Sequence, residues 1–232
     1  MLIAVHQPNF MPWPGYFDKI QRADTFVFLD HVEVNIKTPN WLKKVFISNN
    51  GKKYPITLPL KKGESGSFQN INEIHVDILN PQWKKLSKTI AQFYSKHPYY
   101  NEYKYLTEQY FGDDKKSLLS KNVAFIKEVL ALLQIDTQLE FSSDLSPDSS
   151  SNQMLIELVK HHGGNEYLAG DGADGYQDEE LFKSEDLTLR TQNFKQPVYN
   201  QPNSDQFLGG LSIVDMLFNI GADETIIKLK GE

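Results

Sequence analysis

The sequence contains no cysteine and only two arginines, Arg22 and Arg190. The absence of cysteine excludes a disulfide framework, a thiol nucleophile and a cysteine-ligated zinc or iron–sulfur site. No apolar run approaches the roughly 20 residues that a membrane-spanning helix requires. The apolar residues 2–5 at the start are too few for a signal peptide. We therefore expect a cytoplasmic protein without a membrane span.

The composition is that of a globular protein with one core. The chain has 232 residues, of which 40% are hydrophobic and 23% charged, and this length predicts a single domain over residues 1–232. A net charge of −6 argues against a general nucleic-acid binder. Neither a phosphate-binding glycine loop nor a dinucleotide fingerprint is present.

The charge is unevenly distributed along the chain. Residues 37–62 contain seven lysines and no acidic residue, whereas residues 142–186 contain eleven acidic residues and two lysines. The lysine run has two interpretations, a solvated face or a patch that binds a phosphorylated small molecule. Lysine would act in such a patch as a point charge, without the bidentate geometry of arginine.

The first thirty residues have the pattern of a strand–helix–strand unit. Residues 1–6 form a predicted buried strand that ends at His6, and a loop with three prolines follows. A helix is expected from near Tyr16, and residues 25–29 form a second β-prone run that stops at Asp30. This order is typical of a parallel sheet, which places ligands at the carboxyl ends of its strands.

The remaining segments complete the predicted fold class. It is α/β, with a mostly parallel sheet, flanking helices, a β-hairpin insertion and a helical block over about residues 81–135. The hairpin is expected at the turn Asn49-Asn50-Gly51. Further strands are expected over residues 41–48, 53–60, 71–76 and 166–169, a strand end near 141, and helices over residues 152–162 and 212–220.

Two loops carry the polar residues with the best-defined chemistry. His6, Gln7 and Asn9 lie at the strand end and in the proline-rich loop that follows it, where an imidazole can reach a phosphate or move a proton, or can simply cap the strand. Gly15 lets a ligand approach the backbone. Ser142, Ser143 and Asp144 follow a strand end and either bind substrate or cap a helix. The loop from Gly170 to Gly175 offers a carboxylate for magnesium but lacks the spacing of a calcium loop.

The chain resembles the WbqC-like protein family in blocks spread along nearly its whole length. The blocks are Ile3–Phe10, Pro12-Trp13, Gly15–Ile20, Ala23–Asp30, Ser142–Leu145, Tyr167–Gly170 with Gly172-Ala173 and Tyr176, and Leu211–Asn219. The resemblance implies a part in bacterial surface-polysaccharide biosynthesis, of the O-antigen type. The reaction it suggests is a transferase or ligase step that forms an acyl or aminoacyl amide on a nucleotide-activated amino sugar. The alternative is a non-catalytic protein that binds a sugar nucleotide or a partner enzyme.

On this hypothesis His6 contacts phosphate or moves a proton, and Asp30 acts as a base or metal contact. Gln7 and Asn9 orient the substrate. The other substrate-binding candidates are Gly15, Tyr16, Lys19, Lys37, Asn40, Lys43, Lys44, Ser142, Ser143, Asp144, Gly170, Gly172, Tyr176, Asp215 and Asn219. These candidates are expected to border one shared cavity.

The expected partners are small molecules. A nucleotide-activated amino sugar or another phosphorylated small molecule is predicted, and nucleic acid is not. No metal ligands are assigned. The cofactor is left open, with ATP and magnesium as the candidates that the reaction class suggests, and the oligomeric state is left open, with a homodimer as the candidate.

Overall fold

The structure is a computed structural model that describes residues 1–63, 66–173, 177–202 and 204–231. The chain divides into two compact units and passes between them repeatedly. The first unit comprises Met1–Pro8, Gly15–Val32 and Ile135–Lys195, and the second comprises Asn9–Pro14, Glu33–Gln134 and Gln196–Glu232. This division does not test the single domain expected over residues 1–232, which stays a prediction.

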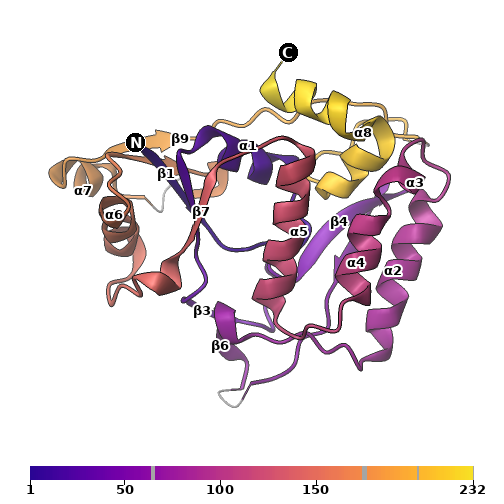
Figure 1. Cartoon of the computed structure of the whole chain (residues 1–232), viewed down its shortest axis with the longest axis horizontal. Coiled ribbons are helices and arrows are strands. Elements are labelled where there is room, and N and C mark those ends of the chain that lie inside the picture. The colour runs from indigo at the N-terminus through magenta and orange to yellow at the C-terminus, as the bar shows by residue number, and fades with distance from the viewer. Residues whose placement is uncertain (64–65, 174–176, 203, 232) are drawn as a thin grey trace. The chain divides into compact units, whose positions relative to one another are not determined.

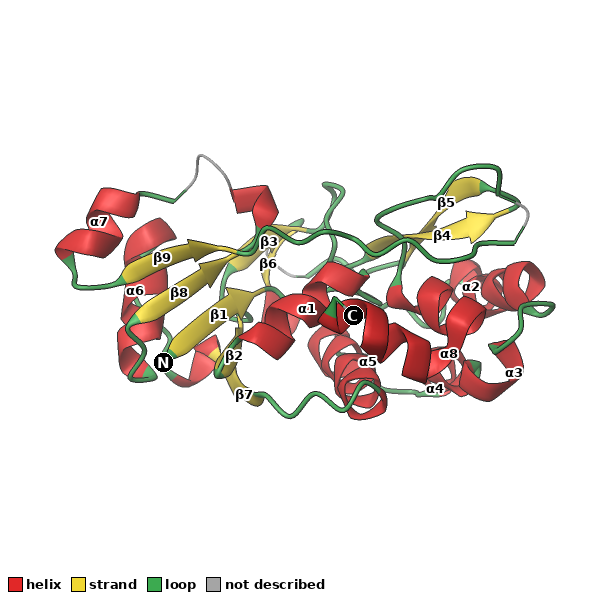
Figure 2. Ribbon diagram, turned by 90° about the horizontal axis from the view of Figure 1, so that it is seen from above, coloured by secondary structure: helices red, strands yellow, loops and turns green. Residues whose placement is uncertain are grey.

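The first unit contains a five-stranded sheet in which every strand is parallel to its neighbours. In space the strands follow the order β7-β2-β1-β8-β9, as Figure 2 shows. The strands are β1 (Leu2–His6), β2 (Thr25–Phe28), β7 (Gln138–Phe141), β8 (Glu166–Ala169) and β9 (Thr188–Thr191). The other elements are α1 (Pro14–Arg22), α6 (Ser151–His161), α7 (Glu179–Ser184) and the 3₁₀ turns η2 (Ser142–Asp144) and η3 (Asp171–Ala173) (Figure 1). The predicted parallel α/β sheet is confirmed.

Helices cover both faces of this sheet. Successive side chains of a strand point to opposite faces, so each strand contributes side chains to the packing on both. On one face, Ile3 and Tyr167 belong to a core cluster shared with buried residues of α6 and α7. On the other face, the Tyr16 ring of α1 lies 5.5 Å from the Phe26 ring. The sheet is therefore the middle layer of three, as parallel sheets generally are.

The order of the strands contains a switch point. Along the chain, β1, β2 and β7 extend the sheet in one direction, and β8 and β9 then extend it from β1 in the opposite direction. The chain that leaves β1 therefore continues through α1 to one side of the sheet, and the chain that leaves β8 continues through α7 to the other side. Doubly wound sheets bind ligands in the crevice that forms there.

The second unit combines two small antiparallel sheets with helices. Its strands are β3 (Glu33–Asn35) paired with β6 (Phe68–Asn70), and β4 (Lys44–Asn49) paired with β5 (Lys52–Thr57). Its helices are α2 (Pro81–Tyr94), α3 (Tyr100–Tyr103), α4 (Tyr105–Gly112), α5 (Leu118–Leu132) and α8 (Ile213–Lys230), with the 3₁₀ turn η1 (Ile71–Glu73). Helices α2, α4 and α5 lie side by side (Figure 1). The hairpin at Asn49-Asn50-Gly51 and the helical block are confirmed.

Some predicted elements were wrong in type or extent. Residues 71–76 begin with a 3₁₀ turn, because a turn sends Ile71 and Ile74 into the core, where both are fully buried. Residues 41–43 form a turn before β4. Helix α8 continues past the expected end at residue 220, with a break at Gly221, where φ is 75°. The sequence pattern also gave no indication of α7 or β9.

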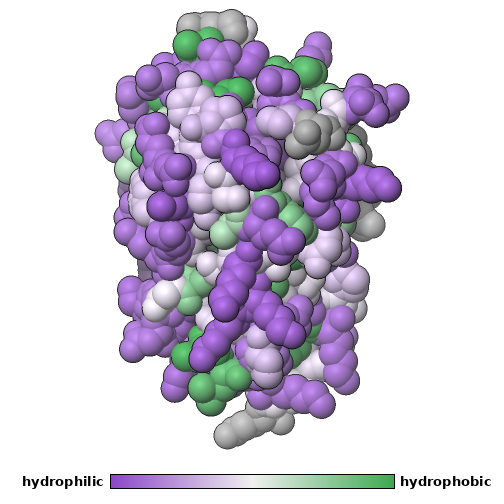
Figure 3. Space-filling model, turned by 90° about the vertical axis from the view of Figure 1, so that its right-hand side faces the viewer, coloured by the Kyte–Doolittle hydropathy of each residue, from purple (hydrophilic) through white to green (hydrophobic). Residues whose placement is uncertain are grey.

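No helix among the described residues is long and apolar enough to span a bilayer. The face in Figure 3 is mostly hydrophilic, and its hydrophobic residues form small separate groups. Isolated surface hydrophobics of this kind are normal for globular proteins.

Candidate functional site

A pocket of about 320 Å³ lies at the switch point of the first unit. Its apolar lining comes from the ends of β1 and β2, from β8 and from the start of α6, and its polar lining includes His6 and Gln7. The pocket is bordered by Val5, His6, Gln7, Leu29, Ser151, Asn152, Met154, Leu155, Tyr167 and Gln177. An apolar cavity with a few convergent polar groups is the usual form of a small-molecule site, and this volume is at the lower end of the usual range.

His6 presents a neutral imidazole at this pocket. Its Nδ1 lies 3.0 Å from the carbonyl oxygen of Gln7, which only accepts hydrogen bonds, so Nδ1 carries the proton. The Tyr16 ring packs on the imidazole edge at 5.0 Å. Burial, and to a lesser extent the charge of Lys19, lower the pKa of His6 to about 4. At neutral pH the lone pair on Nε2 therefore stays unprotonated and can accept a hydrogen bond.

Lys19 is a buried amine beside the same strand ends. It is 3% exposed, and its Nζ donates a 2.9 Å hydrogen bond to the Val5 carbonyl oxygen. Burial lowers the pKa of Lys19 to about 7, although the nearby Asp171 carboxylate opposes this shift. A side chain on Gly170 would come within 3.9 Å of Nζ. The amine thus lies against the end of β8 and can hold or release a proton near neutral pH.

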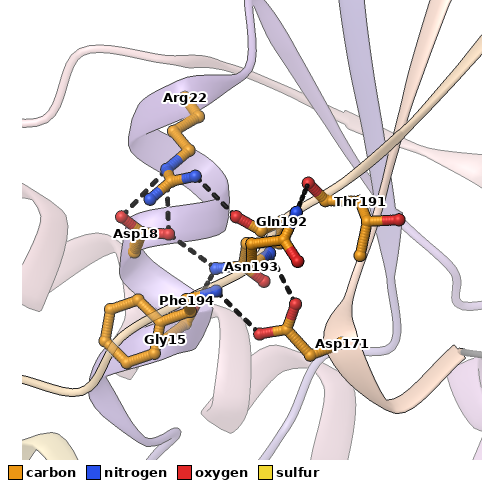
Figure 4. Close-up of polar contacts among 8 residues, drawn as sticks. All are labelled: Gly15, Asp18, Arg22, Asp171, Thr191, Gln192, Asn193 and Phe194. Carbon is orange, nitrogen blue, oxygen red and sulfur yellow. Dashed lines mark hydrogen bonds and ion pairs between the residues drawn. The ribbon is translucent and has the colours of Figure 1, made fainter.

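A polar cluster fixes α1 against the ends of β8 and β9 (Figure 4). Gln192 Nε2 donates to the Gly15 carbonyl oxygen and to Asp18 Oδ2, both at 2.7 Å. Arg22 donates to the Gln192 carbonyl oxygen at 2.7 Å and pairs with Asp18 at 3.0 Å. Because α1 carries Tyr16 and Lys19, these bonds fix the Lys19 amine beside the strand ends and the Tyr16 ring beside the His6 imidazole.

Asp171 also belongs to this edge of the sheet. Its two carboxylate oxygens accept hydrogen bonds from the backbone N–H groups of Asn193 and Phe194, at 2.6 and 2.9 Å (Figure 4). Within the described parts of the chain, no group of three or more His, Asp or Glu side chains is arranged to hold a metal ion. The neighbouring candidate Tyr176 lies outside the described residues.

Asp30 is 2% exposed, and its carboxylate binds the turn η2 from the end of β2. Its oxygens accept from the Ser142 hydroxyl (3.0 Å), the Ser143 amide (2.9 Å) and the Ser143 hydroxyl (2.8 Å). His31 Nδ1 lies 2.6 Å from Ser142 Oγ. Since Ser142 already donates its proton to Asp30, Nδ1 must donate here. These hydrogen bonds explain how the Asp30 carboxylate can be buried. Its predicted role as a base stays a prediction.

The candidate residues fall into two groups. The first unit contains His6, Gln7, Gly15, Tyr16, Lys19, Asp30, Ser142, Ser143, Asp144, Gly170 and Gly172; the second contains Asn9, Lys37, Asn40, Lys43, Lys44, Asp215 and Asn219. Of these, His6 and Gln7 line the switch-point pocket, and Lys19 and Gly170 lie beside each other. The shared cavity expected for both groups stays a prediction.

Asp215 is fully buried within the second unit and accepts hydrogen bonds from Tyr94, Tyr199 and Gln201. Burial raises the pKa of this carboxyl group, although these hydrogen bonds oppose the shift. Asn219 donates to the Asp215 backbone carbonyl at 2.7 Å and lies 2.7 Å from His97 Nδ1. These contacts make Asp215 the centre of a buried polar network. Asn219 also borders a pocket of about 720 Å³ in the second unit, and the binding roles of Asp215 and Asn219 stay predictions.

The structure adds residues that the sequence did not single out. Tyr167, Met154 and Leu155 form the apolar side of the pocket, and Gln192 holds α1 in place. In the sequence these three residues have the pattern of ordinary core positions, since Tyr167 lies in a predicted strand and Met154 and Leu155 lie in a predicted helix. Gln192 follows β9, which was not predicted, so no signal pointed to it.

The strand order and the helices on both faces of the sheet place the first unit in the class of doubly wound α/β folds. The chain belongs to the WbqC-like protein family, whose model matches residues 7–227. It is similar to "Uncharacterized protein Rv1507c" of Mycobacterium tuberculosis (strain ATCC 25618 / H37Rv), with 28% identity over 228 residues, 95% of this chain and 94% of that protein. No solved structure gives a significant match.

Proposed function

We propose that this protein is a transferase or ligase of surface-polysaccharide biosynthesis that forms an acyl or aminoacyl amide on a nucleotide-activated amino sugar. The observation that carries the proposal is the neutral imidazole of His6 at the switch-point pocket. Amide formation needs a group that accepts a proton from the attacking amine. His6 Nε2 is unprotonated, and the negative charge of a bound phosphorylated substrate would raise its pKa from about 4 towards the range in which it takes this proton. Membership of the WbqC-like family supports the substrate class.

The reaction assigns a role to each part of the site. The free amine of the sugar attacks the carbonyl carbon of an acyl phosphate or acyl adenylate. A C–N bond forms, and the bond between the carbonyl carbon and the oxygen attached to phosphorus breaks. Phosphate (from an acyl phosphate) or AMP (from an acyl adenylate) leaves with the bonding electron pair. One amine proton passes to His6 Nε2. In a ligase, ATP and the carboxylic acid supply the activated donor, and magnesium accompanies the nucleotide.

The pocket is suited to one part of such a substrate. Val5, Met154 and Tyr167 offer apolar contacts to a sugar ring or an acyl chain, and Gln7 offers amide hydrogen bonds. With a volume of about 320 Å³, it accommodates a monosaccharide-sized group, and the nucleotide would extend beyond it.

The test combines thermal shift with product analysis. The wild type is mixed with a panel of nucleotide-activated amino sugars, with and without ATP, magnesium and carboxylic acids, and amide products are sought by mass spectrometry. The proposal expects stabilisation by an amino-sugar nucleotide and an amide product. His6→Ala should lower turnover at least about a hundredfold, with the melting temperature within a few degrees of the wild type.

His161→Ala is the matched control, because this exposed histidine lies at the opposite end of α6 from the pocket. It should retain wild-type turnover. Wild-type turnover in His6→Ala would refute the proposed role of the imidazole. Stabilisation by the sugar nucleotide without any amide product would favour the alternative, a non-catalytic binding protein.

A further inference from the structure

A second pocket, of about 720 Å³, lies along α8 in the second unit. It is bordered by Tyr99, which precedes α3, by residues 198–200, and by side chains of α8 from Asn219 to Lys228. Its volume is more than twice the 320 Å³ or so of the switch-point pocket. The reaction proposed above gives it no role. We call it the α8 pocket.

The break in α8 at Gly221 holds Tyr99 at this pocket. In an uninterrupted helix the Phe218 carbonyl would accept a hydrogen bond from the Ala222 N–H. At the break, the Phe218 carbonyl accepts instead from the Tyr99 N–H at 3.0 Å. The Ala222 N–H donates to the Tyr103 hydroxyl of α3 at 3.2 Å. The groups that the break releases therefore bind the chain at α3, which lies beside α8 (Figure 1).

The Tyr99 ring forms a supported aromatic surface in the α8 pocket. A Cβ atom at Gly221 would lie 3.0 to 3.3 Å from three atoms of this ring, so the ring packs closely against the glycine backbone. The rest of Tyr99 is open, since 39% of the residue is exposed. A flat ring that the fold supports and leaves partly open is a surface on which the C–H groups of a sugar ring stack.

The α8 pocket also contains side chains that bind hydroxyl groups. Asn200 is exposed, and within the described residues its amide forms no hydrogen bond with the protein. Glu224 and Lys228 form an ion pair at 3.6 Å. Lys228 is the one cation among the described residues of the lining, so the pocket carries no excess positive charge. Amide and carboxylate oxygens accept hydrogen bonds from hydroxyl groups, and the amide nitrogen also donates.

We propose that the α8 pocket binds a neutral oligosaccharide, with one sugar ring on Tyr99 and hydroxyl groups on Asn200 and Glu224. The pocket is large enough for about two sugar units, since the switch-point pocket of less than half this volume accommodates one. The proposal is independent of the amide-forming reaction, because it concerns binding by the second unit alone.

The chemistry of the lining favours a neutral sugar over a phosphorylated or an apolar ligand. A phosphate group would meet the Glu224 carboxylate and a lysine that is already paired, so like charges would repel it. A purely apolar ligand would cover Asn200 and Glu224 without offering them a hydrogen-bond partner, which costs free energy. A sugar supplies both hydroxyl groups and an apolar ring face.

The experiment is saturation-transfer NMR of the full chain with four neutral disaccharides, which are maltose, cellobiose, lactose and N,N′-diacetylchitobiose. At least one should bind, with the strongest saturation at ring C–H protons and with an affinity that does not change with salt. Tyr99→Ala should weaken this binding about tenfold, and Tyr99→Phe should retain it. The matched control is Tyr54→Ala, since Tyr54 is 41% exposed and lies outside the α8 pocket; it should bind as the wild type does.

Asn200→Ala is the second variant, because an exposed side chain without a hydrogen bond to the protein is removed without harm to the fold. It should weaken binding about fivefold, the effect of one lost hydrogen bond. Three results would overturn the proposal. These are no binding of any of the four disaccharides, equal losses in Tyr99→Ala and Tyr54→Ala, and tighter binding of glucose 1-phosphate than of every disaccharide.

Discussion

Replacing Asp215 by alanine is expected to lower the free energy of unfolding by about 3–5 kcal/mol, because it removes the acceptor from a buried network. Tyr94 and Tyr199 donate to its two oxygens at 2.5 and 2.8 Å, and Gln201 donates at 3.1 Å. In the variant these groups stay buried without their partner. Tyr94 also accepts from the Ser48 amide at 2.8 Å, so the loss extends to β4.

Urea unfolding followed by circular dichroism measures this effect. Asp223→Ala is the matched control, since Asp223 is an exposed acid on the same helix, and it should change stability by less than about 0.5 kcal/mol. A loss in Asp215→Ala no larger than in the control would show that the network is not a stabilising core.

The second large effect concerns Lys19, whose pKa is about 7 in the folded protein against a usual 10.5. Between these values the unfolded chain holds a proton that the folded protein has released, so stability rises as the pH increases from 7 to 10. Relative to Lys19→Met, which lacks this proton, the wild type should gain about 3 kcal/mol over that range. Below pH 7 Lys19 is protonated in both the folded and the unfolded protein, so the free-energy cost of burying the ammonium no longer changes with pH.

The measurement is urea unfolding of both proteins at several pH values. At pH 7 Lys19→Met should be the more stable protein, because the cost of the buried charge exceeds the roughly 1 kcal/mol lost with the bond to the Val5 carbonyl. Lys183→Met, at an exposed position of α7, should follow the wild type at every pH. Parallel curves for the wild type and Lys19→Met would show that the amine is not desolvated. A loss of stability of this kind is typical of functional sites.

The sequence predicted the parts of the fold that local patterns determine. The apolar run before His6, the proline-rich loop and the second apolar run before Asp30 gave the first strand–helix–strand unit, and the Asn-Gly turn gave the hairpin. It could not give the order of five strands, because β7 pairs with β2 across more than a hundred residues. The helix expected over residues 212–220 ends where α8 breaks at Gly221; the continuation to Lys230 was missed because a glycine inside a helical pattern is ambiguous.

For the candidate site, the sequence identified residue types but not their surroundings. It singled out His6 and Gln7, which line the pocket, and Lys19, which lies beside the strand ends. It did not predict that the Asp30 carboxylate accepts hydrogen bonds from Ser142 and Ser143. That difference depends on hydrogen bonds to η2, which no local pattern specifies.

The most direct test of the proposed site is an NMR titration of the His6 ring, assigned by comparison with His6→Ala. The account predicts a pKa of about 4, a proton on Nδ1 at neutral pH, and a change in the Nε2 signal when an amino-sugar nucleotide is added. An imidazole that titrates near the ordinary value of 6.5 and whose signals do not respond to any member of the ligand panel would contradict it.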